Sequence, residues 1–470
     1  MRKLENCEKQ LQTIERTREC HMNVRGLPRQ IHENVWVTCI FAAVIFEGAL
    51  RKWVLPAWLH PGAFFAKDVV GICYIASRSN YARNRYQNRL TLLGYSTAGL
   101  LFIGFVLGLS SSWQSAIVTY KNAVLWPLIA GCVIATTTNE TWRFLSVLIA
   151  PTTIAMFVLG FKQFLNPPSS WLNQYAWTAA GLQSPVATFG GIQGVRATGT
   201  FSYISGMSEF SVFSFVLCLY YLLNSFTLKE RFLLIVGCLA AIGCAVESGS
   251  RAPIVLMAFV AATTSVMSLR SARKTVYIGM FLVAVTALML FLPDNKMTRE
   301  YLKRWTVDPQ ETLRRFTNEG LRGNYLEMLI INPIGIGLGQ GNGYAIFETS
   351  RTNQLLATNI YDDGASIAIY EGGLLGLLAF YLAPCVLSAQ LALGLTSRVL
   401  ALRLLAGTFG LVSVLGLIAG VWHDHNSAAF TWLQIGIWFG LAKGFVGTRR
   451  GRTGGLEELL IRKPGRIRMV

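Results

Sequence analysis

Two short polar segments each place an arginine at the edge of a long apolar stretch. RATGTF holds Arg196 a few residues before the apolar run that begins near residue 204, and ESGSRAP holds Arg251 in a very tight turn between two further runs. A guanidinium donates two parallel hydrogen bonds to a phosphate and keeps its charge. Either arginine could instead anchor a helix end at a polar boundary. We predict that the two arginines come together and bind a phosphate group.

A third segment, residues 296–322, is strongly basic and contains Arg315 and Arg322. These two arginines are weaker candidates for the same phosphate site. The alternative for this segment is an amphipathic helix whose charged face lies in solvent.

Acidic and histidine residues offer proton chemistry near two other apolar runs. Asp362 and Asp363 stand at the start of YDDGASIAIYEGG, where one of them could act as a general base toward a substrate hydroxyl. The alternative is that they cap a helix N-terminus. His423 and His425, in WHDHN, form either a polar relay or a simple polar turn, and their spacing predicts no metal site.

The composition is that of a polytopic membrane protein. Of the 470 residues, 53% are hydrophobic and 14% are charged, whereas soluble domains carry about 25% charged residues. The formal charge of +18 is concentrated in short segments beside apolar runs. This pattern favours topology signals and contact with anionic membrane lipids over nucleic-acid binding.

Apolar blocks of about 20 residues predict an all-α integral membrane protein, because about 20 residues cross the hydrocarbon core. The second block is the weakest, since it is short and contains Lys67 and Asp68. The pair 33–77 could therefore be re-entrant, and if only one of its members crosses, the orientation of the rest inverts. The expected spans are 33–50, 62–77, 91–109, 115–136, 143–163, 204–224, 231–246, 252–269, 275–293, 364–387, 399–420 and 427–447.

The distribution of Lys and Arg predicts that both termini are cytoplasmic. The chain then divides into a basic N-terminal segment (1–32), a membrane domain (33–447) and a basic tail (448–470). Two long loops, about 164–203 and 294–363, fall on the extracytoplasmic side together with Arg196 and Arg251. Loops of this length in a compact protein are usually functional or disordered, so we expect the chemistry there.

Four motifs, in this order, resemble the superfamily of O-antigen ligases and O-antigen polymerases. They are RATGTFSY, ESGSRAPIVLM, NPIGIGLGQG and YEGGLLGLLAF, within residues 190–390. The resemblance implies a GT-C-like, all-helical glycosyltransferase with about 12 spans, using an undecaprenyl-diphosphate-linked glycan as donor without a metal or other cofactor. By motif, Arg196 and Arg251 match family arginines that engage the donor diphosphate. Ligases often carry His-Asn where this chain has Asp362-Asp363, which favours a polymerase.

We therefore predict a polysaccharide polymerase of the bacterial inner membrane, working at its periplasmic face. Its expected partners are the lipid-linked donor, an acceptor glycan, membrane lipids and other polysaccharide assembly proteins. One alternative is a ligase that transfers finished glycan to a lipid A core or a protein. Another is a lipid-glycan flippase or secondary transporter, for which internal repeats and charges near the membrane midplane are typical.

Overall fold

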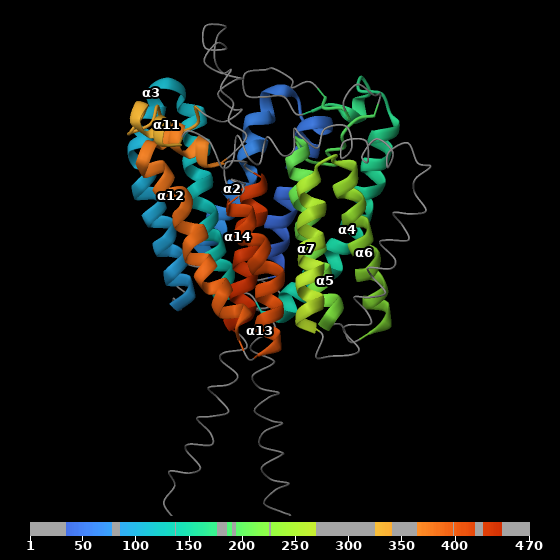
Figure 1. Ribbon diagram of the computed structural model, residues 1–470. Helices are drawn as coiled ribbons and strands as arrows, with labels where there is room; N and C mark the ends of the chain where they lie inside the picture. Colours follow the sequence, from blue (N-terminus) through green and yellow to red (C-terminus); the bar gives the residue numbers. More distant parts are fainter. Residues whose placement is uncertain are drawn as a thin grey trace, which may run out of the picture.

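The described part of the chain is all-helical. The computed structural model describes residues 34–77, 85–136, 138–175, 186–189, 194–224, 227–268, 325–340, 364–397, 399–418 and 426–443. Among these residues no strand is present beyond one isolated bridge between Thr188 and Val195. The helices run along a common direction and form one bundle (Figure 1).

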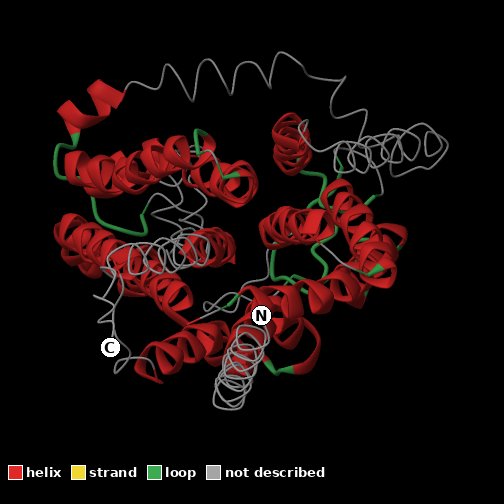
Figure 2. Ribbon diagram, turned by 90° about the horizontal axis from the view of Figure 1, so that it is seen from below, coloured by secondary structure: helices red, strands yellow, loops and turns green. Residues whose placement is uncertain are grey.

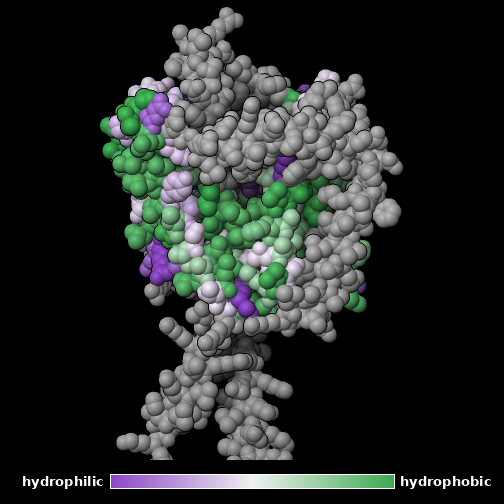
Figure 3. All heavy atoms as spheres, viewed as in Figure 1, coloured by the Kyte–Doolittle hydropathy of each residue, from purple (hydrophilic) through white to green (hydrophobic). Residues whose placement is uncertain are grey.

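Helices occupy eleven of the twelve predicted intervals, and the twelfth, 275–293, lies outside the described residues. The chain is a multi-pass membrane protein, and its total number of spans stays a prediction. On the face shown in Figure 3, hydrophobic side chains cover most of the described surface between the ends of the bundle. Seven helical stretches are long and apolar enough to cross a membrane: Asn34–Val54, Asn88–Ser111, Trp113–Thr136, Asn139–Leu165, Ile204–Asn224, Gly364–Leu395 and Leu400–Ile418.

The remaining intervals are filled by shorter or more polar helices. They include α2 (His60–Ser77), α6 (Leu228–Glu247), α7 (Arg251–Ser268) and the helical residues 426–443. The predicted interval 399–420 is occupied by α13 (Leu400–Leu405), a π turn η6 (Ala406–Gly410) and α14 (Leu411–Ile418) in direct succession.

Helix α3 (Arg85–Thr136) folds back on itself. Its 52 residues would reach about 78 Å as a straight helix, far more than a membrane is thick. The Tyr120 hydroxyl donates to the carbonyl of Ala98 at 3.2 Å, and the rings of Phe105 and Tyr120 stack with centroids 4.5 Å apart. These contacts join residues about 20 positions apart, so α3 is a hairpin of two spans.

The helices pack in two groups (Figure 2). One group consists of α4 (Asn139–Leu165), α5 (Ile204–Asn224), α6 and α7, and the other of α2, α3, α12 (Gly364–Leu395) and α14. Buried rings attach two further helices to α5 and the segment before it. Phe430, in the helical residues 426–443, contacts Phe201, Phe210 and Phe213 at 5.4 to 6.0 Å between centroids. Phe41 adds a contact to Phe213 at 5.0 Å. This aromatic core holds α5 at the centre of the molecule.

The described polar segments lie at one end of the bundle. RATGTF precedes α5, the ESGS turn joins α6 to α7, and the glycine-rich loop follows α11 (Tyr325–Ile331) directly. All of these lie at the upper end of the bundle in Figure 1, where α5, α7 and α12 begin. This end is called the Arg196 end below.

Candidate functional site

Arg196 docks on the turn between α6 and α7. Its Nε donates to the carbonyl of Ser248 at 2.8 Å, and the backbone N–H of Ala197 donates to the carbonyl of Glu247 at 2.9 Å. Gly249 makes this approach possible, since its φ is +66° and a Cβ there would lie 2.9 Å from Arg196 Nε. Arg251 opens α7 two residues later. The two segments that carry the predicted arginines are therefore neighbours, and their binding of phosphate stays a prediction.

Tyr175 and Ala187 support Arg196 from the preceding loop. The backbone N–H of Arg196 donates to the carbonyl of Ala187 at 2.9 Å, and the N–H of Ala187 donates to the hydroxyl oxygen of Tyr175 at 3.1 Å. Burial raises the pKa of Tyr175 to about 12, so this hydroxyl is neutral at physiological pH. The loop around Arg196 is thus ordered by hydrogen bonds on both sides of the arginine.

Two buried side chains hold the rest of the RATGTF segment. The Gln163 side-chain oxygen accepts from the backbone N–H groups of Thr198 and Gly199 at 3.1 and 2.8 Å. Lys52 Nζ donates to Thr198 Oγ1, Gly199 O and Phe201 O at 2.8 to 2.9 Å. Lys52 belongs to the π turn η1 (Leu50–Val54) that ends the first helix. All three ammonium hydrogens of Lys52 have a protein acceptor, so it positions this loop.

Glu247 is a buried carboxylate beside this site. It is 0% exposed, and neither carboxylate oxygen has a hydrogen-bond partner among the described residues. Its Oε2 lies so close to Gly160 of α4 that a Cβ on Gly160 would approach it to 2.1 Å. The neighbouring Ser248 hydroxyl accepts from Ser208 Oγ of α5 at 3.0 Å. The α6–α7 turn is therefore packed tightly against both α4 and α5.

The glycine-rich loop and the EGG segment of α12 also meet. Backbone N–H groups of Ile336 and Gly337 donate to the carbonyls of Tyr370 and Glu371 at 2.9 and 3.0 Å, and Leu374 N donates back to Pro333 O at 3.0 Å. Gly335 and Gly373 both have positive φ, and a Cβ on either would come within 2.5 Å of backbone atoms. The loop thus approaches a neighbouring helix closely, as its glycines predict.

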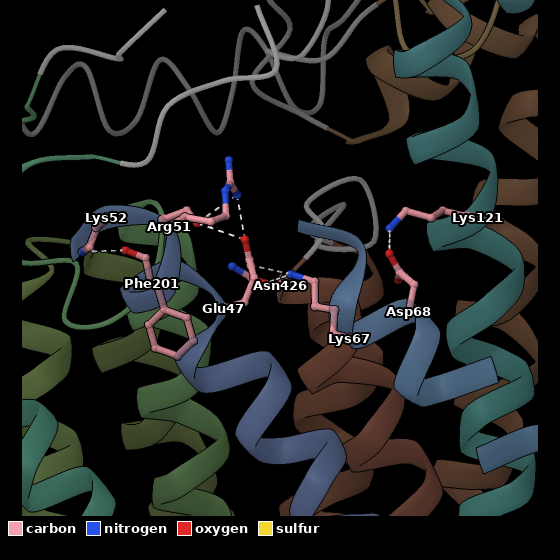
Figure 4. A network of polar contacts seen from close by, with 9 residues as sticks. Glu47, Arg51, Lys52, Lys67, Asp68, Lys121, Phe201 and Asn426 are labelled. Atoms are coloured by element: carbon pink, nitrogen blue, oxygen red, sulfur yellow. Dashed lines mark hydrogen bonds and ion pairs between the residues drawn. The ribbon is translucent and has the colours of Figure 1, made fainter. Parts of the chain in front are cut away.

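An ionic network at the Arg196 end was missed by the sequence analysis. Glu47 accepts from Arg51 Nη1 at 2.6 Å and from Lys67 Nζ at 2.9 Å, and Lys67 also donates to the Asn426 side chain. Lys121 of α3 pairs with Asp68 of α2 (Figure 4). Two features of the sequence pointed this way. Arg51 and Lys52 lie on the first predicted extracytoplasmic connection, where the positive-inside rule disfavours cations, and Lys67 and Asp68 lie inside the weakest predicted span. Arg51, Lys67 and Asp68 all belong to this network.

Arg51 joins the network to the Arg196 segment. Its Nη1 also donates to Ser202 Oγ at 3.2 Å, directly after the RATGTF residues that Lys52 holds. A continuous polar layer therefore runs from the α6–α7 turn, through RATGTF and η1, to α2 and the α3 hairpin. Among the described Lys, Arg, Asp and Glu side chains that the first three helical segments contribute to this layer, there are four cations and two carboxylates: Arg51, Lys52, Lys67 and Lys121 against Glu47 and Asp68.

The other predicted site residues lie outside the described residues. This holds for the general-base candidates and the weaker phosphate candidates as well as for the polar cluster of the last turn: Asp362, Asp363, Arg315, Arg322, His423 and His425. Within the described ranges, no group of three or more His, Cys, Asp or Glu side chains has a geometry that could hold a metal.

Comparison with models of known protein families gives no match to this chain, and comparison with curated proteins gives none either. The assignment of a function therefore depends on the chemistry of the polar layer at the Arg196 end.

Proposed function

We propose that this protein is a membrane glycosyltransferase that polymerises undecaprenyl-diphosphate-linked glycan units. The observation that carries the proposal is the contact of Arg196 Nε with Ser248 O, which sets Arg196 beside the turn from which Arg251 begins α7. Two guanidinium groups from separate segments suit the two phosphates of a lipid diphosphate. The resemblance of the four motifs to polymerases and ligases points to the same donor.

In the proposed reaction the lipid diphosphate is the leaving group. A hydroxyl of the acceptor glycan attacks the anomeric carbon of the donor sugar, the bond from that carbon to the diphosphate oxygen breaks, and the hydroxyl proton passes to a base. Negative charge grows on the diphosphate in the transition state, where Arg196 and Arg251 stabilise it. Asp362 or Asp363 is the proposed base. Arg315 or Arg322 is proposed to complete the cationic site.

The position of the site fits a substrate with a long apolar tail. The polar layer lies at one end of the bundle, and the described surface on the face shown in Figure 3 is mainly hydrophobic. A lipid carrier in the membrane could thus present its diphosphate at the level of Arg196. In this proposal the Arg196 end faces the periplasm and both termini face the cytoplasm of a bacterial inner membrane.

Replacement of either arginine tests the proposal. In cells that lack the chromosomal copy, we expect Arg196→Ala and Arg251→Ala to reduce polymer formation at least about a hundredfold, since loss of one transition-state donor has effects of that size. Single-repeat, lipid-linked units should accumulate, as measured by gel analysis of surface and lipid-linked glycans. Arg143→Ala is the matched control. It also removes an arginine, but Arg143 pairs with Glu230 where α4 and α6 begin, away from Arg196 and Arg251.

The pattern of products distinguishes the alternatives. Normal ladders of chain lengths from both arginine variants would overturn the proposal. Long chains that remain unattached in the deletion strain would indicate a ligase, and retention of single units on the cytoplasmic face would indicate a flippase.

A further inference from the structure

Three cations of the ionic network surround one aromatic ring. The distances from the centroid of the Phe64 ring are 5.2 Å to Arg51 Cζ, 5.5 Å to Lys67 Nζ and 5.1 Å to Lys121 Nζ. In Figure 4, Lys67 lies between Arg51 on one side and Lys121 on the other. These three cations with Phe64 are called the Phe64 cluster. Three like charges gathered around one ring create a local positive potential, which favours an anion.

Among the described residues, the network holds the three cations of the Phe64 cluster and two carboxylates. Glu47 is shared by Arg51 and Lys67, and Asp68 pairs with Lys121. The side chain of Lys67 is completely buried, whereas those of Arg51 and Lys121 keep 9% and 15% of their surface exposed. Arg51 and Lys121 are therefore the two cations of the cluster that keep some surface for contact with an anion.

The Phe64 cluster borders a hydrophobic stripe on α2. Phe65, Val69 and Ile72 are 36%, 56% and 55% exposed, and their spacing puts them on one face of the helix. Lys121 Nζ lies 4.8 Å from the centroid of the Phe65 ring, at the upper end of this stripe. A molecule with an anionic head and a long apolar tail would thus find matching surfaces in sequence along α2. A free phosphate would use only the cationic part.

Lys52 differs from the Phe64 cluster although it comes from the same π turn. Its three hydrogen bonds all go to atoms of the Arg196 segment, so its ammonium group stabilises that segment. The polar layer thus has two cationic regions with Lys52 between them. One is the Arg196 segment with the α6–α7 turn, and the other is the Phe64 cluster.

We infer that the Phe64 cluster binds the diphosphate of a second lipid-linked substrate, the acceptor. This inference rests on the proposed function, in which Arg196 and Arg251 hold the diphosphate of the donor. A polymerase whose acceptor is also still attached to its lipid carrier needs two anionic sites open to the membrane. The acceptor lipid lies along Phe65, Val69 and Ile72, and its diphosphate contacts Arg51 and Lys121.

The test counts lipids bound to the purified full-length protein in micelles of a neutral detergent by native mass spectrometry, with geranylgeranyl diphosphate as the probe. Two bound molecules per chain are expected. Lys121→Gln combined with Asp68→Asn removes an ion pair without changing the net charge. It should weaken one binding event about tenfold or more, the size expected for a lost charge-assisted hydrogen bond. Arg251→Ala should weaken the other event.

Two variants separate binding from folding. Lys121→Arg keeps the charge and the pairing with Asp68, so it should retain two bound lipids. The double variant Arg143→Gln and Glu230→Gln removes an ion pair between α4 and α6, away from both cationic regions, and should also retain two. If the Lys121 and Asp68 double variant does not fold, Phe65→Ser replaces it, because Phe65 lies on the exposed stripe. This variant should also lose one of the two bound lipids.

Several results would overturn the inference. A single bound lipid that depends only on Arg251 would do so, as would equal occupancy by phosphatidylglycerol or by free pyrophosphate, which lacks a tail. Because occupancy is counted without turnover, it is independent of the proposed reaction. Two bound lipids in a protein that makes no polymer in cells would reject the proposed function alone. Normal polymer from a variant with an empty Phe64 cluster would reject the acceptor site alone.

Discussion

The Arg196 segment and the Phe64 cluster are both cationic, but they are held in different ways. Around Arg196, side chains bond mostly to backbone atoms, as in Lys52 to Gly199 O and Arg196 to Ser248 O. In the Phe64 cluster, charged side chains bond to one another, as in Lys121 to Asp68. A hydrogen bond to the backbone fixes the position of a side chain. In an ion pair between two side chains, a ligand can replace one partner. We therefore expect the Arg196 segment to keep a fixed geometry and the Phe64 cluster to exchange partners when a ligand binds.

The largest expected effect comes from Lys52→Met. This change removes the Lys52 donor from Thr198 Oγ1, Gly199 O and Phe201 O, of which Gly199 O keeps a bond from Gln163 Nε2. Each buried acceptor that loses its donor costs about 1–3 kcal/mol, so we expect the free energy of unfolding in mixed micelles to fall by at least about 2 kcal/mol. Lys121→Met should have a smaller effect, because Lys121 is partly exposed. If Lys52→Met and Lys121→Met lower the free energy of unfolding equally, the proposed difference between the two regions is wrong.

An intermediate effect is expected from Gly249→Ala. The backbone there has a φ of +66°, and the new Cβ would lie 2.9 Å from Arg196 Nε and 2.8 Å from the Phe189 ring. The left-handed conformation alone costs about 1–2 kcal/mol for alanine. The variant should be less stable to heat and should make shorter polymers, because Arg196 must move.

Gly62→Ala is the matched control for that substitution. Gly62 is an exposed helical residue of α2 with nothing within 4 Å of a Cβ. Alanine should therefore be neutral or stabilise the helix by up to about 1 kcal/mol. If Gly249→Ala proves as harmless as this control, then Arg196 is not fixed by the backbone around it.

The smallest effect is expected from the pair of Arg143 and Glu230, which resembles the Phe64 cluster in bonding but is more exposed. Arg143 Nη2 lies 2.7 Å from Glu230 Oε1, and their side chains are 38% and 25% exposed. Arg143→Gln should cost less than about 1 kcal/mol. The hydrogen bond from Arg143 holds the pKa of Glu230 below its usual range.

This shift gives a direction for the effect of pH. A lowered pKa stabilises the folded protein above the ordinary pKa of a glutamate, and that stabilisation is lost as the pH falls through the lowered pKa. The stability difference between wild type and Arg143→Gln should therefore shrink in acid. A difference that grows below the ordinary pKa of glutamate would contradict the assignment.

Hydrophobic blocks were sufficient to predict the helices, since helices of matching length occupy all the predicted intervals that are described. The motifs also pointed to the contact between RATGTF and ESGSR, because both stand at span ends on one predicted side. The ionic network could not be predicted in this way. Glu47 and Lys67 are 20 residues apart and Lys67 and Asn426 are 359 apart, and nothing local to these residues indicates their partners.

Glu47 shows why single positions in the sequence can mislead. One carboxylate near the end of an apolar run resembles an ordinary span boundary, and its role becomes visible only when the π turn η1 brings Arg51 and α2 brings Lys67 to it. Charges that weaken a predicted span are better interpreted together, as one group that the fold must neutralise.

The loop after α11 has a mechanical consequence. Its residues bond to α12 on both sides of the kink at Gly373, and Leu338 N bonds to Gly104 O in the α3 hairpin at 2.8 Å. Main-chain hydrogen bonds thus join three elements, and a substitution removes one of these donors only if it introduces proline, which has no N–H group. If α12 tilts, the α3 hairpin must tilt with it. We therefore expect α12, the loop after α11 and the hairpin to move as one rigid body when a lipid binds.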